Sequence, residues 1–255
     1  MFTKSDITGD LKRLGLVRGD SVVVHSSYKK IGTVDGGPHA VVEALAGVVL
    51  PGGALLFPNL NIPHEFTTAN PPRFDLQKDH IKNLGILPEI FKFQYARYFS
   101  IHPTHALTGI GEKAPELLSG HEKAGGPCGR GTPWEKNAKA GGKILLIGVD
   151  GWSNTTGHCA EEQIADPYIL SKDIINGTVI LDGRELTVPS RLHIWGFHSN
   201  FNMLHADLQG RGSLRAGKIG SADSRCIDAG ALVSLALERL QGNPKFFRDK
   251  KPRTT

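Results

Sequence analysis

The feature that most constrains the fold of this chain is a strand–helix–strand unit within residues 20–58. The β-branched run "SVVV" at 21–24 predicts a buried strand, and "ALLFP" at 54–58 predicts a second one. Between them, "DGGPHAVVEALAGVVLPGG" predicts a helix with Pro38 in its first turn and a glycine-rich end. Because two strands joined through a helix normally pair in parallel, the unit predicts an α/β fold.

Later segments extend this sheet. The apolar run "GGKILLIGV" predicts a central strand, and "CIDAGALVSLALERLQGNP" predicts an amphipathic helix capped by Asp228. "GTVILDGRELTVP" predicts a hairpin around Asp182-Gly183, and "RLHIWGF" predicts another strand. We therefore expect an α/β fold with a mainly parallel central sheet flanked by helices. We expect a single domain over residues 1–255, with a small antiparallel insertion at about 164–200.

The composition is typical of a globular protein, with 39% hydrophobic and 22% charged residues. The formal net charge of +5 suits an anionic ligand such as a coenzyme, although the basic residues are scattered. They cluster only in "FFRDKKPRT", for which a frayed tail is the simpler interpretation. No stretch has the length of a membrane span. We therefore expect neither nucleic acid nor a membrane as a partner.

The cysteines and the N-terminal segment suggest a location. Three cysteines, Cys128, Cys159 and Cys226, lack CxxC spacing, and an odd number argues against a disulfide framework. The segment "MFTKSDITGDLKRLG" predicts an amphipathic helix capped by Thr3 or Ser5, and it lacks the apolar core of a secretion signal. We expect a cytoplasmic protein.

Polar residues follow two predicted strands, at the sheet edge where α/β proteins bind ligands. After the first strand, "HSSYKKIGTVDGG" begins with His25 and combines hydroxyls, lysines and glycines. Such a turn can hold a phosphate through its backbone N–H groups, but by pattern alone a serine-capped turn before a glycine-rich helix start is slightly favoured. It matches neither the dinucleotide-binding nor the Walker pattern.

Two further segments carry weaker signals. "SIHPTHALTGIG" contains two histidines around a proline, without a third ligand at a metal-binding spacing. A proline-containing strand entry that lines a pocket explains it better. "GGPCGRGTPW" is a glycine-rich segment, for which a surface loop is the default interpretation.

The stretch "TTGHCAEEQ" follows the predicted central strand. His158 and Glu161 are three residues apart, so on a helix they share one face. The carboxylate would fix the imidazole tautomer and favour its protonation, which suits a general base. A polar helix start, with a threonine cap and acids near the positive helix end, explains the pattern equally well. A metal site with Cys159 is less favoured because adjacent residues on a helix point apart, and we expect no metal.

Several blocks in the same order resemble the aminoglycoside N3-acetyltransferases, an acetyl-CoA-dependent family that does not have the common GNAT acetyltransferase fold. The blocks span residues 3 to about 247. They are "VVVHSSYKKIGTVDGG", "LPGGALLFP", "FDLQKDHIKNLGILPEIFK", "SIHPTHALTGIG", "GTPWEKNAKAGGKILLIGV", "TTGHCAEE" and "GKIGSADSRCIDAGALVSLALERL". The resemblance implies an acyltransferase with acetyl-CoA as cosubstrate.

The resemblance also implies which residues form the site. His158 and Glu161 match the catalytic HxxE pair, and His25 lies at the transfer point. Asp75 and Glu162 are the expected substrate-binding acids. The expected coenzyme-binding residues follow the first strand or belong to the HPTH segment: Ser26, Ser27, Tyr28, Gly32, Thr33, Val34, Thr104, His105, Ala106 and Leu107.

The expected reaction is transfer of acetyl to an amine, foremost the 3-amino group of 2-deoxystreptamine aminoglycosides, which is an antibiotic-resistance activity. The segment "RLHIWGFHSNFNML" contains no acid, whereas aminoglycoside acceptor sites are rich in acids. Acyl transfer to a different amine therefore stays open. Two alternatives from other classes also remain: a hydrolase or lyase that uses the same His/Glu pair, and a non-catalytic coenzyme or nucleotide binder. A homodimer is a further expectation.

Overall fold

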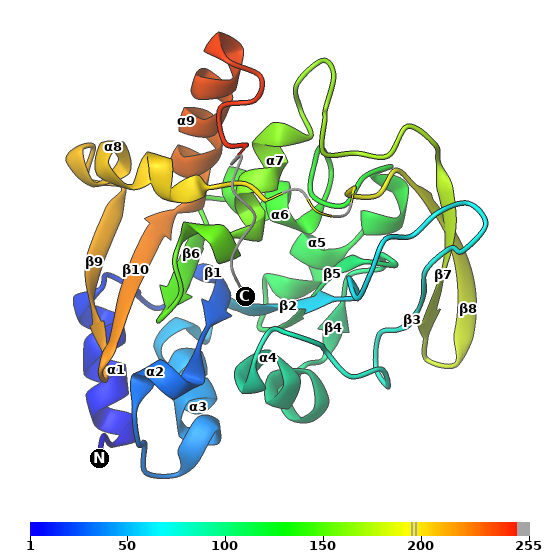
Figure 1. Cartoon of the computed structure of the whole chain (residues 1–255). Coiled ribbons are helices and arrows are strands. Elements are labelled where there is room, and N and C mark those ends of the chain that lie inside the picture. The colour runs from blue at the N-terminus through cyan, green and yellow to red at the C-terminus, as the bar shows by residue number, and fades with distance from the viewer. Residues whose placement is uncertain (195, 197, 249–255) are drawn as a thin grey trace.

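A seven-stranded sheet forms the centre of the computed structural model, which describes residues 1–194, 196 and 198–248. The strand order is β4-β5-β2-β1-β6-β10-β9 (Figure 1). In this order the strands are β4 (Tyr98–Phe99), β5 (His105–Ile110), β2 (Ala54–Leu60), β1 (Ser21–Ser26), β6 (Lys143–Ile147), β10 (Ala222–Asp228) and β9 (Leu214–Ile219).

The parallel part of this sheet is its centre. β1 pairs in parallel with β2 on one side and with β6 on the other, as the strand–helix–strand unit predicts. β5 runs antiparallel to β2, and β10 runs antiparallel to β6. The predicted α/β class is confirmed. The antiparallel pair β9–β10 at one edge was not predicted, because "GKIGSADSRCID" has too little apolar alternation to indicate strands.

Helices cover both faces of the sheet. Successive strand residues point to opposite faces, so Val22 and Val24 pack in one apolar cluster with α1 and α3, whereas Val23 packs in the other with α9. The first helix, with its Thr3 cap, and the closing helix are both confirmed, but Asp228 makes no side-chain capping hydrogen bond to the closing helix. The helices are α1 (Lys4–Arg13), α2 (Tyr28–Ile31), α3 (Gly37–Val49), α4 (Ile86–Ile90), α5 (Ala114–Leu118), α6 (Pro133–Lys139), α7 (His158–Glu161), α8 (His205–Gly210) and α9 (Ala229–Gly242).

A smaller sheet of three strands, in the order β3-β7-β8, stands beside the main one (Figure 1). It contains the predicted hairpin, which turns at Asp182 (φ 52°) and Gly183 (φ 73°), as a two-residue turn of this kind requires. Val179 and Val188 pack with Ala106 of β5 in a third apolar cluster. The strands are β3 (Arg73–Asp75), β7 (Ile175–Leu181) and β8 (Arg184–Ser190).

The strand expected at residues 191–197 is not formed in the part that the structure describes. His193 makes one isolated bridge to Leu170, while Trp195 and Phe197 lie outside the described residues. All three cysteines are free thiols. In the described part of the chain, no helix is both long and apolar enough to cross a membrane.

Candidate active site

The proposed catalytic segment begins at the carboxyl end of the central strands. Ser26, the last residue of β1, lies opposite Ile147, the last residue of β6. After β6 the chain turns through two short 3-10 segments into α7, which begins at His158. Gly157 lies where this segment meets the buried ring of Phe201, and a Cβ atom there would lie 2.5 Å from that ring. The glycine therefore lets α7 pack closely against residue 201.

His158 and Glu161 form a direct pair. The Nδ1 atom of His158 lies 2.6 Å from Oε2 of Glu161, whose side chain is fully buried. Ser199 donates to both oxygens of Glu161, at 2.7 and 2.9 Å, and the Tyr168 hydroxyl donates to Oε1. The carboxylate is thus held by three side chains, of which Tyr168 and Ser199 come from the expected insertion at 164–200.

The pair has the electrostatics of a general base. Burial alone would raise the pKa of Glu161, but the hydrogen bonds from His158, Tyr168 and Ser199 outweigh it and lower that pKa. Because Glu161 is ionised, Nδ1 of His158 must donate, and Nε2 of the neutral ring is an acceptor. The His158 side chain is 23% exposed, so a ligand can reach it.

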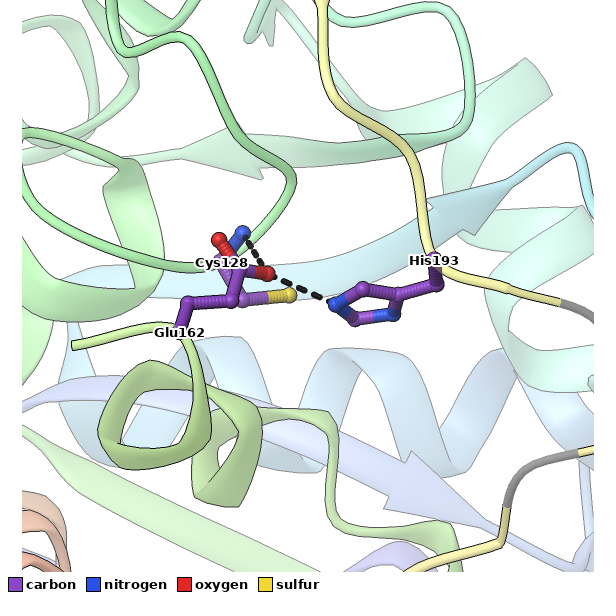
Figure 2. A group of neighbouring side chains, drawn as sticks. All are labelled: Cys128, Glu162 and His193. Carbon is purple, nitrogen blue, oxygen red and sulfur yellow. Dashed lines mark hydrogen bonds and ion pairs between the residues drawn. The ribbon is translucent and has the colours of Figure 1, made fainter. Parts of the chain in front are cut away.

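A second histidine–glutamate pair lies beside the first. Nε2 of His193 lies 2.6 Å from Oε1 of Glu162, and the His193 ring meets the His158 ring edge to face with centroids 4.8 Å apart. The backbone N–H of Cys128 also donates to the Glu162 carboxyl group, at 2.8 Å (Figure 2). The backbone N–H of Gly129 donates to the same carboxyl group at 2.7 Å.

The second pair prefers to be uncharged. Burial lowers the pKa of His193 well below its ordinary value and raises the pKa of Glu162 to about 8. The two backbone N–H donors oppose the shift of Glu162 without cancelling it. Near neutral pH, His193 is therefore neutral and Glu162 is mostly protonated, in contrast to the ionised Glu161.

His25 is buried at the end of β1. Its ring stacks on Trp134 with centroids 6.2 Å apart, and its Nε2 atom has no hydrogen-bond partner among the described residues. Burial lowers the pKa of His25 to about 3, so this imidazole is neutral at physiological pH. Ser26 Oγ and Thr156 Oγ1 also lack a hydrogen-bond partner in the described structure. A bound ligand could satisfy such buried polar atoms.

A pocket of about 680 Å³ lies at the carboxyl ends of β1 and β6. Ser27 and Lys30 line it, and Arg225 of β10 adds a second cation. Of the other residues expected to bind the coenzyme, Tyr28 lies in α2 next to Ser27. Gly32, Thr33 and Val34 instead turn toward the N-terminal segment, where Phe2 bridges to Val34 and donates its N–H to the carbonyl of Thr33. Of the residues expected to bind the coenzyme after β1, Ser27 therefore lines the pocket, whereas residues 32–34 lie against the N-terminal segment.

The HPTH segment is more deeply buried than a pocket wall. His102 accepts hydrogen bonds at Nδ1 from the backbone N–H groups of Thr104 and His105, and it organises the entry to β5. Ala106 and Leu107 are fully buried in two different apolar clusters. Their side chains have no polar atom to offer a coenzyme. His105 has a closer relation to the site, because its ring meets that of His193 with centroids 4.5 Å apart.

The two expected substrate acids are occupied by other groups. Both oxygens of Glu162 bond within the structure, and its side chain is only 2% exposed. Asp75 lies in β3, where its Oδ1 accepts the backbone N–H groups of Gln77 and Lys78. Neither carboxylate stands ready on an open surface for a polycation, so we do not retain these two residues as an acceptor site.

Sequence reasoning missed the residues that hold the glutamates. Tyr168, His193 and Ser199 follow Glu162 by 6 to 37 positions in sequence, without a spacing that indicates a site. Cys128 comes from the segment interpreted as a surface loop, yet it is fully buried. The one available signal was the consecutive pair "EE". If both carboxyl groups are buried behind a central strand, each needs its own set of hydrogen-bond partners.

The comparisons with known proteins cover nearly the whole chain. Residues 23–241 match the family described as aminoglycoside 3-N-acetyltransferase. YokD of Bacillus subtilis strain 168, a prophage-derived aminoglycoside N(3')-acetyltransferase-like protein, is 29% identical over 92% of this chain and 90% of its own length.

Solved structures show the same similarity in three dimensions. The crystal structure of aminoglycoside acetyltransferase AAC(3)-Xa matches with a TM-score of 0.80 and 27% identity, over 96% of this chain and 93% of its own. The binary structure of AAC-IIIb with CoASH matches with a TM-score of 0.79 and 26% identity, over 98% and 99% of the two chains.

Proposed function

Because this chain belongs to the aminoglycoside 3-N-acetyltransferase family, we propose that it transfers the acetyl group of acetyl-CoA to an amine, with His158 as general base. The observation that carries this assignment is the His158–Glu161 pair. It combines a buried, ionised carboxylate with an imidazole that is partly exposed. The coenzyme is the cosubstrate of the family, and the match to the AAC-IIIb–CoASH structure supports it.

The reaction needs one proton to move from nitrogen to sulfur. As the amine attacks the thioester carbon, Nε2 of His158 takes a proton from the amine, and the Glu161 carboxylate stabilises the resulting imidazolium. Backbone N–H groups stabilise the oxyanion of the tetrahedral intermediate. The carbon–sulfur bond then breaks, and the sulfur leaves with the electron pair. It takes the proton from His158, giving the amide and the free thiol of coenzyme A.

His25 has a narrower role than its sequence position suggests. An imidazole with a pKa of about 3 does not carry a proton to a thiolate near neutral pH. A neutral ring can still donate or accept one hydrogen bond, and its Nε2 atom lacks a partner in the described structure. We assign His25 to holding the thioester or the acceptor at the transfer point.

The pocket at Ser27 and Lys30 is the candidate coenzyme site. It opens where the parallel strands end, which is where α/β folds bind ligands. Lys30 and Arg225 can each contact a phosphate group, although Asp150 and Asp223 also line the pocket. Ser26 and Ser27 are the hydroxyl residues of this turn. The assignment replaces the broader set of coenzyme residues expected from the sequence, from which the buried Ala106 and Leu107 are dropped.

The first candidate acceptor is the 3-amino group of a 2-deoxystreptamine aminoglycoside, as the family name implies. A second candidate, an amine of lower positive charge such as a monoamino sugar, is favoured by one specific observation. Oδ1 of Asp75 and both oxygens of Glu162 already accept hydrogen bonds within the chain, so these two groups are less available to a polycation than open surface acids.

Release of free thiol from acetyl-CoA tests the proposal. The purified protein is assayed with a panel of aminoglycosides and, in parallel, with monoamino sugars, and each product is checked by mass for one added acetyl group. Acceptor-dependent thiol release is the expected result, and the site of acetylation is read by NMR. Thiol release without any acetylated product would support a hydrolase. If the protein neither releases thiol with any acceptor nor binds coenzyme A, the transferase assignment is wrong.

A further inference from the structure

The fold brings together three side chains of different chemistry beside the His158–Glu161 pair. The thiol sulfur of Cys128, a carboxyl oxygen of Glu162 and a ring nitrogen of His193 all lie within 4.8 Å of one another. Figure 2 shows the sulfur pointing toward the His193 ring, next to the Glu162 carboxyl group. This is a different set from His158, Cys159 and Glu161, the metal site that the sequence disfavoured. Its members come from three separate segments, so no spacing in the sequence could have indicated it.

We propose that Cys128, Glu162 and His193 form a binding site for a zinc ion or a similar divalent transition-metal ion. Sulfur, imidazole nitrogen and carboxylate oxygen are the three atom types that bind zinc in proteins. A thiolate disfavours magnesium and calcium, which prefer oxygen ligands. Three protein ligands leave a fourth position open, as in sites where zinc also holds water or a substrate atom.

The distances allow such a site after a small adjustment. Tetrahedral zinc bonds of about 2.0–2.3 Å place ligand atoms roughly 3.3–3.8 Å apart. The present separations of up to 4.8 Å therefore need a contraction on the order of 1 Å, and the 2.6 Å hydrogen bond between His193 and Glu162 would lengthen. His193 lies outside the helices and strands, in a connecting segment, and its side chain is 15% exposed. It is the member best placed to move.

Charge balance supports a divalent ion in this buried place. A thiolate from Cys128 and a carboxylate from Glu162 together carry two negative charges, which neutralise the two positive charges of the ion. A buried ion that is neutralised by its ligands avoids most of the cost of an isolated charge. Without a metal the Cys128 side chain stays an uncharged thiol, because burial and then the nearby Glu162 carboxyl group raise its pKa well above its ordinary value.

The carboxyl group is also held in the manner of a metal ligand. The backbone N–H groups of Cys128 and Gly129 each donate to one of the Glu162 oxygens and fix the plane of the group. Outer hydrogen bonds of this kind orient the ligands in metal sites. The same hydrogen bonds would form if Glu162 only anchored the 124–131 loop. Measuring metal binding distinguishes this structural role from a role as a ligand.

The test needs no substrate and does not depend on the acetyl-transfer proposal. Protein without a histidine tag is stripped with a chelator, loaded with zinc or cobalt(II), and dialysed. We expect about one equivalent of zinc per chain. With cobalt we expect a near-ultraviolet thiolate-to-cobalt charge-transfer band, which the other histidines cannot produce.

Three variants and one control decide the outcome. Cys128→Ser should abolish the charge-transfer band. Glu162→Gln and His193→Gln should weaken zinc binding by at least the roughly 10- to 100-fold that is typical even for loss of outer-shell partners. Cys226 of β10 packs in a different apolar cluster from Cys128, so Cys226→Ser should bind zinc as the wild type does. If Cys128→Ser does not fold, as judged by circular dichroism, His193→Gln alone decides. Binding below one tenth of an equivalent, or equal binding by the folded variants, would overturn the site.

Discussion

The rings of His158 and His193 meet edge to face with centroids 4.8 Å apart, and each is held by one of two consecutive glutamates. The pKa of Glu161 is lowered, whereas burial raises the pKa of Glu162 to about 8. Near neutral pH, His158 therefore has an ionised carboxylate as its partner, whereas His193 has a mostly protonated carboxyl group. An ionised partner favours uptake of a proton, which supports the proposal that His158 is the base.

Removing this base should have a large kinetic effect. We expect His158→Gln to lower the acceptor-dependent rate by about 10²- to 10⁴-fold at saturating acetyl-CoA, the range typical of a general base. Glu161→Gln should act in the same direction, because the imidazolium loses its charged partner. His39→Gln, a helix histidine bonded to Tyr95, serves as a matched control with unchanged rate. Near-full turnover by folded His158→Gln would refute the assignment.

The coenzyme pocket gives a prediction about charge. Lys30 lines the pocket and adjacent Lys29 does not, so Lys30→Ala and Lys29→Ala remove the same charge at different places. We expect Lys30→Ala to weaken coenzyme A binding by a few-fold, up to roughly 10-fold, since an exposed cation contributes modestly to holding a phosphate. Lys29→Ala should change it little. Calorimetric titration with coenzyme A measures both, and equal effects would place the phosphates elsewhere.

The close packing at Gly157 predicts a difference between two glycines. A Cβ atom at Gly157 would meet the buried Phe201 ring at 2.5 Å, so Gly157→Ala should destabilise the protein by about 1–3 kcal/mol. Gly47 lies in α3, and a Cβ atom there meets no described atom within 4 Å. Gly47→Ala should stabilise by roughly 0.5–1 kcal/mol. Urea unfolding compares the two, and a neutral Gly157→Ala would contradict the packing.

Buried histidines predict how stability depends on pH. Burial lowers the pKa of His25 and of His121 to about 3, whereas the unfolded rings titrate near 6.5. Their contribution to stability is therefore complete above pH 6.5 and is lost as the pH falls toward 3. Glu162, with its pKa raised to about 8, acts in the opposite direction: its contribution is lost as the pH rises from about 4.5 through 8.

Urea unfolding between pH 7 and pH 5 checks this balance. The histidines whose pKa is lowered outnumber the one glutamate whose pKa is raised. We therefore expect the free energy of unfolding to decrease as the pH is lowered from 7 to 5. His121→Gln should reduce the slope by up to about 1.4 kcal/mol per pH unit, the effect of one proton. A slope that is the same in both proteins would show that His121 becomes protonated in the folded state.

The elements that the sequence predicted well are those with local signals. The β-branched strand β1, the capped helix α1 and the Asp182-Gly183 hairpin each depend on neighbouring residues, and all three are confirmed. The hairpin β9–β10 was missed because its stability comes from pairing with β6, which local alternation does not reveal.

The site divides in the same way. The His158–Glu161 pair is local to one helical turn, so its spacing suggested a base, and the family resemblance then favoured this interpretation over a polar helix start. The partners of the two glutamates are not local: Cys128 precedes Glu162 by 34 positions and His193 follows it by 31. Their approach depends on how a loop and the 164–200 segment fold back, and a single sequence does not encode that in a readable pattern. The expected acids Asp75 and Glu162 illustrate the limit, since the sequence does not show that each carboxyl group accepts backbone hydrogen bonds within the chain.

Anchoring of the 164–200 segment to both glutamates matters for anyone who builds chimeras within this family. Tyr168 and Ser199 bond to Glu161, and His193 bonds to Glu162. Exchanging that segment for a relative's, in order to import a new substrate preference, would also exchange the supports of the base. Recombination should therefore move α7 and the segment together as one module, with breakpoints before residue 155 and after residue 201.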